Sequence, residues 1–164
     1  MIAGGFLKVV GKNIENDNGK IQLRGIGLGG WLLPEGYMLQ TPMNAPWEIK
    51  QRIVEVVGQQ KADTFWTAYR KNFVQRKDVE RLSQVGFNSV RLPLHWEFFI
   101  NSSGGWRTEG FIIIDSVLHQ CTDNKMYVIL DLHAAPGGQN SANISDYHYP
   151  YPSLWESDSN KQAT

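Results

Sequence analysis

Two apolar runs of this chain end in side chains that can bind ions or polar ligands. Because side chains alternate between the two faces of a strand, Arg91 shares one face with His95, and Asp131 shares one face with His133. In a barrel of parallel strands, polar groups at the carboxyl ends of the strands face a common site. A guanidinium held there favours the charged form of a neighbouring carboxylate. This pattern of polar strand ends is the strongest chemical signal in the sequence.

Two common kinds of cofactor site fit these residues poorly. Asp131 and His133 supply only two candidate metal ligands, whereas zinc sites use three or four; alone, His133 also fits a hydrogen-bonded core residue. Residues 25–30 match the G-x-G-x-x-G pattern, but a dinucleotide site needs a helix that opens at the last glycine. Pro34 follows instead, and glycine within a strand more often marks close backbone packing or a bend. We therefore expect no metal and no nucleotide cofactor.

The elements that position these residues alternate between strand-like and helical patterns. The three expected strands lie near residues 24–32, 87–94 and 126–133. Three helical patterns lie between the first two strands, from Pro46 to Gly86, and one more follows Thr108, a plausible N-cap. Strand, helices, strand, helix, strand implies βαβ crossovers and a parallel sheet, hence an α/β fold. The last strand is almost continuously apolar, which suits a strand covered on both faces.

The remaining segments have simpler patterns. We expect an N-terminal β-hairpin over residues 6–23, with its turn at residues 16–19. The aromatic residues at about four-residue spacing over 65–73 predict a stripe that faces the core. Residues 134–164 are rich in Gly, Asn, Ser, Tyr and Pro and are expected to form one long loop. Loops of that length are usually functional or disordered.

Composition excludes several classes of protein. The chain has 164 residues, with 16 basic and 16 acidic side chains, so polyanions such as nucleic acids are not expected partners. Cys121 has no second cysteine to pair with, and is expected to be a small core residue. No run of about 20 apolar residues and no signal peptide is visible. A full eight-unit barrel needs about 250 residues, so we expect only part of a catalytic domain.

Three motifs together resemble a known family. They occupy residues 23–32 (LRGIGLGGWL), 86–93 (GFNSVRLP) and 128–140 (VILDLHAAPGGQN). In this order they resemble glycoside hydrolase family 5, the cellulase family, and within it most closely the branch of exo-β-1,3-glucanases. The resemblance runs from about Phe6 to Gln162, almost the whole chain.

The resemblance implies a (β/α)8 TIM barrel that hydrolyses β-glucosidic bonds with retention of configuration, using two glutamates and no cofactor. In the family the acid/base glutamate lies in an Asn-Glu-Pro motif after the fourth strand, and the nucleophile ends the seventh. Neither motif is found here, so we expect residues 1–164 to be about three of the eight units, a partial catalytic domain that is inactive alone. The parent protein would be a monomeric glucanase, extracellular or periplasmic.

The resemblance also implies roles for individual residues. Arg91 matches the arginine that hydrogen-bonds the nucleophile and keeps it ionised, and His133 matches a histidine that binds a sugar hydroxyl in the −1 subsite. Glu35 matches an acidic residue that holds sugar hydroxyls, while Asn140 and Asp146 lie in the loop that shapes the same subsite. An ordinary strand-end ion pair for Arg91 and a solvated loop carboxylate for Glu35 remain open.

Other polar and aromatic residues near the expected site have no assigned role. His95 and Glu97 are candidate rim residues, and Asp131 is expected to support Arg91 or the loop. The aromatic candidates for stacking on sugar rings are Tyr37, Trp96, Tyr147, Tyr149 and Trp155. Two rival functions remain: a non-catalytic carbohydrate-binding protein on a barrel scaffold, and a metal-dependent barrel hydrolase. The expected partner in the preferred interpretation is a β-glucan oligo- or polysaccharide.

Overall fold

The computed structural model describes residues 4–43, 45–101, 103–148 and 150–164. Tyr149, one of the aromatic candidates, lies outside them. The strands are β1 (Lys8–Val10), β2 (Asn13–Asn16), β3 (Gly19–Lys20), β4 (Gly25–Gly27), β5 (Ser89–His95) and β6 (Tyr127–Ala134). The helices are α1 (Gly36–Leu39), α2 (Pro46–Val57), α3 (Gln59–Phe73), α4 (Arg76–Gln84), α5 (Glu109–Asp123) and α6 (Asp158–Gln162), with 3-10 turns η1 (Trp96–Phe98) and η2 (Asn143–Ser145).

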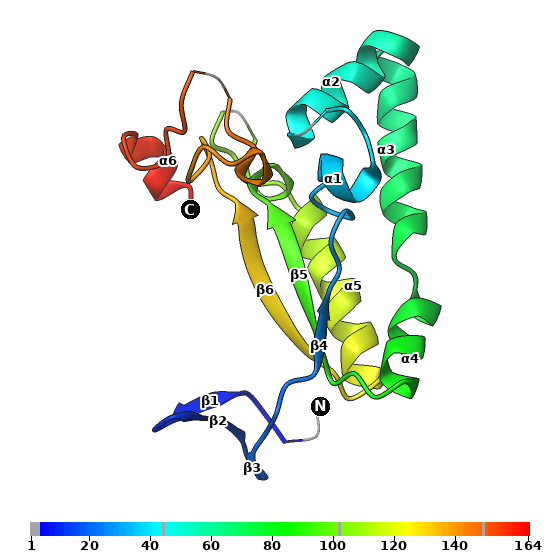
Figure 1. Cartoon of the computed structure of the whole chain (residues 1–164), viewed down its shortest axis with the longest axis vertical. Helices are drawn as coiled ribbons and strands as arrows, with labels where there is room; N and C mark the ends of the chain where they lie inside the picture. The colour runs from blue at the N-terminus through cyan, green and yellow to red at the C-terminus, as the bar shows by residue number, and fades with distance from the viewer. Residues whose placement is uncertain (1–3, 44, 102, 149) are drawn as a thin grey trace.

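A parallel sheet in the order β4-β5-β6 forms the centre of the chain (Figure 1). Helices α2 to α4 connect β4 to β5, and α5 connects β5 to β6. The register pairs Gly27 with Arg91 and Pro93 with Asp131, so the polar residues of β5 and β6 lie side by side. The strands correspond to the three expected runs, although β4 is much shorter than residues 24–32.

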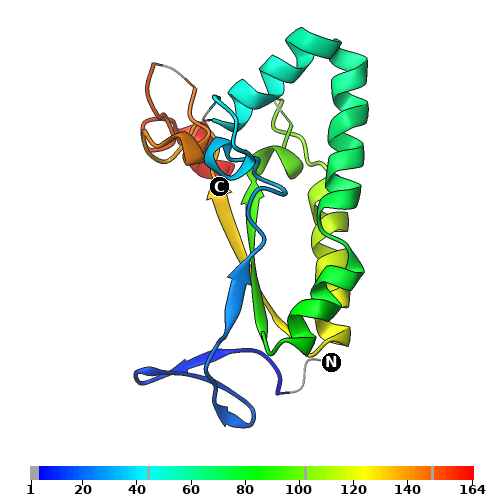
Figure 2. The same cartoon turned by 45° about the vertical axis from the view of Figure 1, so that its right-hand side comes forward.

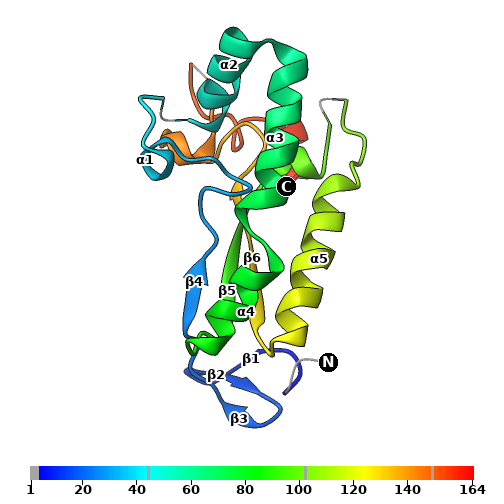
Figure 3. The same cartoon turned by 90° about the vertical axis from the view of Figure 1, so that its right-hand side faces the viewer.

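The helices cover one face of this sheet. Figures 2 and 3 show α4 and α5 on the same side of β5, while the opposite side carries no helix. Val90 and Leu92 of β5 are fully buried and belong to one apolar cluster with Val79 of α4 and with Val117 and Cys121 of α5. This cluster buries alternate residues of β5, so the intervening residues, Arg91 included, lie on the face without helices.

The expectation that the last strand is covered on both faces is wrong for β6. Ile129, Leu130 and Leu132 are 42%, 51% and 37% exposed. The reason is topological, because among the described residues β6 pairs only with β5 and forms the edge of the sheet. An apolar run predicts the environment of a strand only when neighbours are present on both sides.

The glycines of the first strand serve close packing between strands. A Cβ atom added to Gly25 would lie 2.6 Å from the Ser89 hydroxyl of β5, so only glycine fits this register. No helix opens at Gly30; the chain turns instead, buries Trp31, and starts α1 only at Gly36. The context required for a dinucleotide site is therefore not present in this described segment.

The expected two-stranded hairpin over residues 6–23 is instead a three-stranded antiparallel sheet, β1-β2-β3. An additional turn at Gly11, which has a φ of 60°, brings β2 between the other two strands. This small sheet lies at the amino ends of β5 and β6 (Figure 1), where Asn16 donates to the Tyr127 hydroxyl at 3.0 Å. The turn at residues 16–19 has its expected place, between β2 and β3.

Three further expectations need correction. The segment 134–164 contains η2 and α6, so it is not one structureless loop. Thr108 occupies the N-cap position of α5, but its side chain makes no capping hydrogen bond. Phe65 and Phe73 are 44% and 42% exposed, because α3 packs mainly on α2 and turns only part of its aromatic stripe inward.

None of the helices in the described residues is long and apolar enough to span a membrane.

The sheet offers a matched pair of leucines for a stability test. Leu92 is fully buried and Leu130, its register partner on β6, is half exposed. We expect Leu92→Ala to lower the free energy of unfolding by about 2–5 kcal/mol, because it leaves a cavity in the core. Leu130→Ala should cost less than about 1 kcal/mol. Urea unfolding monitored by tryptophan fluorescence measures both, and equal losses would contradict the one-sided core.

Candidate active site

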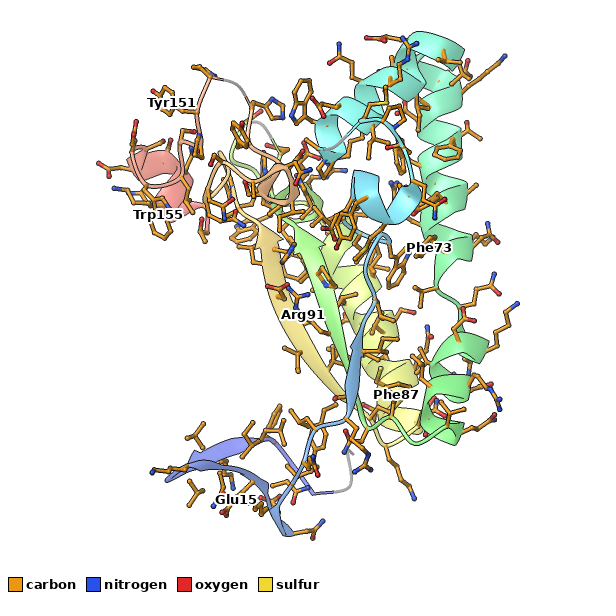
Figure 4. The ribbon with its side chains drawn as sticks, in the orientation of Figure 1. Glu15, Phe73, Phe87, Arg91, Tyr151 and Trp155 are labelled. Carbon is orange, nitrogen blue, oxygen red and sulfur yellow. The ribbon has the colours of Figure 1, made fainter. Side chains whose placement is uncertain are left out.

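A polar cluster occupies the uncovered face of the sheet at β5 and β6. Nη2 of Arg91 lies 2.9 Å from Nδ1 of His133, and the guanidinium also ion-pairs with the Asp131 carboxylate. Nδ1 of His133 lies 2.9 Å from Oδ2 of Asp131. The parallel register causes this meeting, since it sets Pro93 beside Asp131 and so brings the flanking side chains together. Figure 4 shows Arg91 on β5, away from the covering helices.

The contact with Arg91 decides how the His133 ring is protonated. A guanidinium can only donate hydrogen bonds, so Nδ1 must accept, and the proton of the neutral ring then lies on Nε2. No described group accepts a hydrogen bond from Nε2, which leaves this N–H available to a ligand. The backbone at His133 is fixed as well, because Gln139 donates to its carbonyl oxygen at 2.6 Å. The ring is thus held by its neighbours with one donor free.

Glu35 joins the electrostatic environment of this cluster from the loop between β4 and α1. Glu35 is only 4% exposed, and its backbone carbonyl accepts the first hydrogen bonds of α1. Burial raises the pKa of its carboxyl above the ordinary value, while electrostatic interactions with His133 and Arg91 and a hydrogen bond with Tyr37 act in the opposite direction. The three residues predicted for sugar binding or nucleophile support therefore lie within electrostatic reach of one another.

Asp146 bonds to buried groups of the protein, and its sugar contact stays a prediction. Its Oδ2 lies 2.7 Å from Nε2 of His95, and its Oδ1 accepts the amide of Trp47 at 2.8 Å. The side chains of Asp146 and His95 are each only 2% exposed. Both carboxylate oxygens are thus used within the protein, and the residue anchors the loop after β6 to the end of β5 and to the start of α2.

The same loop contact includes an ion pair that sequence reasoning missed. Lys50 of α2 pairs with Glu97 of η1, and the amide of Glu97 donates to Nδ1 of His95 at 3.2 Å. Since Nδ1 accepts that bond, the proton shared with Asp146 lies on Nε2 of His95. The even spacing of His95 from Arg91 on one strand was the only signal of this network, because Lys50 comes from a distant helix.

The other loop candidates make local contacts. Asn140 is exposed, and its Oδ1 accepts the amide of Ala142 at 2.8 Å, which closes a turn before η2. The indole of Trp155 donates to the carbonyl oxygen of Gln139 at 2.9 Å, and its ring is largely exposed on the outer side of the loop (Figure 4). Sugar binding by Asn140 stays a prediction. Within the described part of the chain, no group of three or more His, Cys, Asp or Glu side chains is arranged to hold a metal ion.

Comparison with known proteins identifies the family. The model of the cellulase family, glycosyl hydrolase family 5, matches residues 50–162. The chain belongs to glycosyl hydrolase family 5. This match begins within α2 and extends to the end of α6, so it includes Arg91, His133 and the whole loop that Asp146 anchors.

Named relatives of this family 5 chain are fungal. It is 34% identical over 154 residues to a beta-xylosidase of Phanerodontia chrysosporium, covering 92% of the chain and 32% of the relative. It is 25% identical over 162 residues to a glucan 1,3-beta-glucosidase of Candida oleophila, covering 92% of the chain and 38% of the relative. The chain therefore spans about a third of the length of these relatives.

Solved structures of rutinosidases share the fold of this family 5 chain. AoRut superposes with a TM-score of 0.70 at 18% identity, and the rutinosidase of Aspergillus niger superposes with a TM-score of 0.71 at 16% identity. Each match covers 87% of this chain and 41% of the other. Family and fold together establish a partial, TIM-barrel-like α/β fold, with β4, β5 and β6 as its described parallel strands.

The effect of the Arg91 charge on the pKa of the Glu35 carboxyl can be tested directly. We expect Arg91→Gln to raise the pKa of the Glu35 carboxyl further, because the variant removes a positive charge that favours the ionised form. Titration of the ¹³C-labelled carboxyl by NMR measures the shift. Arg76→Gln is the control, since Arg76 pairs with Glu80 and Asp123 instead. An unchanged Glu35 pKa in Arg91→Gln would show that the two groups are not coupled.

The buried contacts of the Asp146 carboxylate predict that the free energy of unfolding depends on pH. Burial alone would raise the pKa of Asp146, but the hydrogen bond and field of His95, the Trp47 amide and Lys50 together lower it. A lowered folded-state pKa stabilises the protein above the unfolded value, and that stabilisation is lost as pH falls through the folded value. Asp146→Asn should therefore be less stable than the unmodified chain by about 1–3 kcal/mol at pH 7.

The difference between the two proteins should shrink as pH falls below the ordinary pKa of an aspartate and through the lowered folded-state value, where Asp146 takes up its proton. Urea unfolding at a series of pH values measures it. Asp115→Asn, at an exposed position of α5, is the matched control and should show no such trend. A constant gap over the whole pH range would rule out a charged Asp146 as the source.

Proposed function

We propose that this chain is the N-terminal portion of a retaining β-glucan hydrolase and supplies part of the sugar-binding site next to the scissile bond. The observation that carries the proposal is the contact of Arg91 with His133 on the open face of the sheet, 2.9 Å apart, with buried Glu35 in the same field. Family membership favours this reading over a non-catalytic carbohydrate-binding protein.

In this proposal each residue has a separate task. The free Nε2–H of His133 donates to a hydroxyl of the bound sugar, and Glu35 accepts from another hydroxyl when ionised. Arg91 holds a carboxylate nucleophile in its charged form, so that it can attack the anomeric carbon. Asp131 ion-pairs with Arg91 and so keeps the guanidinium in place. We also propose that Asn140 belongs to the same subsite.

The two glutamates that perform the chemistry are not identified among these residues. No Asn-Glu-Pro motif occurs in the 164 residues, so the chain alone is expected to be inactive. The reaction of retaining hydrolases needs only the two carboxyl groups and water, and the proposal therefore includes no cofactor. We further propose a monomeric full-length protein that acts outside the cytoplasm, either extracellular or periplasmic.

The relatives guide the choice of substrate. The glucan 1,3-beta-glucosidases are named for a β-1,3-linked glucan and the beta-xylosidase for a β-linked xyloside. A β-linked neutral sugar is common to both names, and the roughly balanced charges of this chain suit a neutral polymer. We therefore propose β-1,3-glucan oligosaccharides as the first substrates to test, and β-xylosides as the second.

Binding to the chain itself provides the test. Laminaribiose titrated into ¹⁵N-labelled protein should shift the ring signals of His133, and His133→Ala should weaken binding about five-fold, as expected for the loss of one hydrogen bond. His119→Ala, at an exposed position of α5, is the control and should bind as the unmodified chain does. The chain should release no glucose from laminarin. Equal affinity of the two variants would contradict a sugar contact of His133.

A further inference from the structure

The carboxyl end of β6 carries an irregularity in its pairing with β5. Leu132 pairs with Leu94, and Ala134 pairs with His95. His133 lies between these pairs and has no register partner among the described residues of β5. Such a bulge leaves one residue outside the ladder and can re-aim its side chain. The histidine proposed to bind sugar is therefore a residue whose backbone the neighbouring strand does not fix.

The side chain of Gln139 bonds to the backbone at this bulge. Its Nε2 donates to the carbonyl oxygen of His133 at 2.6 Å, and its Oε1 accepts the amide of Ala135 at 3.2 Å. A carboxamide has a donor and an acceptor on one planar group, so it can bond to both backbone groups at once. The two bonds tie the end of β6 to the first residues of the loop that follows it.

The turn between these residues has the conformation that the contact needs. Gly137 and Gly138 have φ angles of 76° and 75°, which let the chain reverse its direction. The amide of Gly138 donates to the carbonyl oxygen of Ala135 at 2.9 Å. The carbonyl oxygen of Gln139 accepts the indole N–H of Trp155 at 2.9 Å. The loop therefore holds the backbone of Gln139, while the side chain of Gln139 holds the end of β6.

Burial makes the bonds of the Gln139 side chain hard to replace. Ala134 is fully buried, Ala135 is 5% exposed, and Gln139 is half-buried. A backbone group that loses its partner where water has little access costs free energy. Without the amide of Gln139, the backbone at His133 is expected to shift toward another hydrogen-bond donor.

Two contacts then determine the direction of the His133 ring. Arg91 holds the imidazole, since its Nη2 lies 2.9 Å from Nδ1, and Gln139 holds the backbone from which the ring projects. The direction of the free Nε2–H depends on both. We propose that Gln139 is a positioning residue, which sets the sugar affinity of His133 by fixing the bulge at the end of β6. The inference rests on the proposed function for the sugar, but the effect on the ring can be measured without sugar.

The experiment replaces the amide of Gln139 by a carboxyl group of the same shape. In Gln139→Glu the ionised carboxylate can accept from Ala135 but cannot donate to His133, whereas the protonated carboxyl can do both. At pH 7 we expect Gln139→Glu to bind laminaribiose about three- to five-fold more weakly than the unmodified chain, and no more weakly than His133→Ala. The affinity ratio of the two proteins should return to one as the introduced carboxyl takes up its proton.

Three further variants separate positioning from a general loss of structure. Gln139→Met removes both hydrogen bonds and cannot titrate, so its affinity relative to the unmodified chain should stay low at every pH. Gln60→Glu adds the same charge at an exposed position of α3 and should bind as the unmodified chain does. In the His133→Ala background, Gln139→Glu should weaken binding no further, because the ring through which it acts is absent. Urea unfolding at each pH shows that the variants are folded, and Gln139→Met provides the test if Gln139→Glu does not fold.

Other groups around His133 and its loop titrate equally in the proteins compared. They are Arg91 of β5, Asp131 of β6, Glu35 of the loop before α1, and the buried pair of His95 and Asp146. Because each of them is present in the unmodified chain and in Gln139→Glu, the ratio of the two affinities at one pH removes their contribution.

The ¹⁵N signals of the His133 ring, recorded without sugar, complete the test. We expect them to differ between Gln139→Glu and the unmodified chain at pH 7 and to coincide once the introduced carboxyl is protonated. Unchanged ring signals at pH 7, or an equal loss of affinity in the His133→Ala background, would overturn the inference. So would laminaribiose binding without any deficit in Gln139→Glu, which leaves the proposed function intact. Ring signals that change as expected in a chain that does not bind laminaribiose would contradict the proposed function and support the positioning of the ring by Gln139.

Discussion

A guanidinium placed between a carboxylate and an imidazole on neighbouring parallel strands is the contact on which the site depends. Arg91 can donate only, so it orients His133 and ion-pairs with Asp131 at the same time. Parallel pairing with Pro93 opposite Asp131 makes this geometry possible, and a shift of one residue would turn Arg91 into the helical layer. The site is therefore a consequence of register as much as of residue type.

The part of the fold that depends on local pattern could be predicted from the sequence. Apolar runs and helical spacing located β5, β6 and the helices between them, and side-chain alternation placed Arg91 on the face that it occupies. The aromatic stripe of α3, the open edge of β6 and the third strand of the N-terminal sheet could not be predicted in this way. Each depends on which neighbour is present, and neighbours are set by tertiary packing.

The same distinction applies to the site. Arg91, Glu35 and His133 could be chosen because they stand at strand ends or in a motif, and the structure brings them into one field. Asp146 was also chosen, yet its oxygens are taken by His95 and by an amide 99 positions away in sequence. No local signal reports such a contact. A loop carboxylate that looks available in a sequence can be the part that holds the loop.

The position of the small antiparallel sheet has a practical consequence. It lies at the amino ends of β5 and β6 (Figure 1), whereas His133 of the proposed sugar site is near the carboxyl end of β6. Its exposed turn at Gly11 has open space around it, so a dye, spin label or surface linker attached there would sit at the opposite end of the molecule from any bound glycan. Immobilisation through this turn would leave the end with the proposed sugar site directed toward the solution.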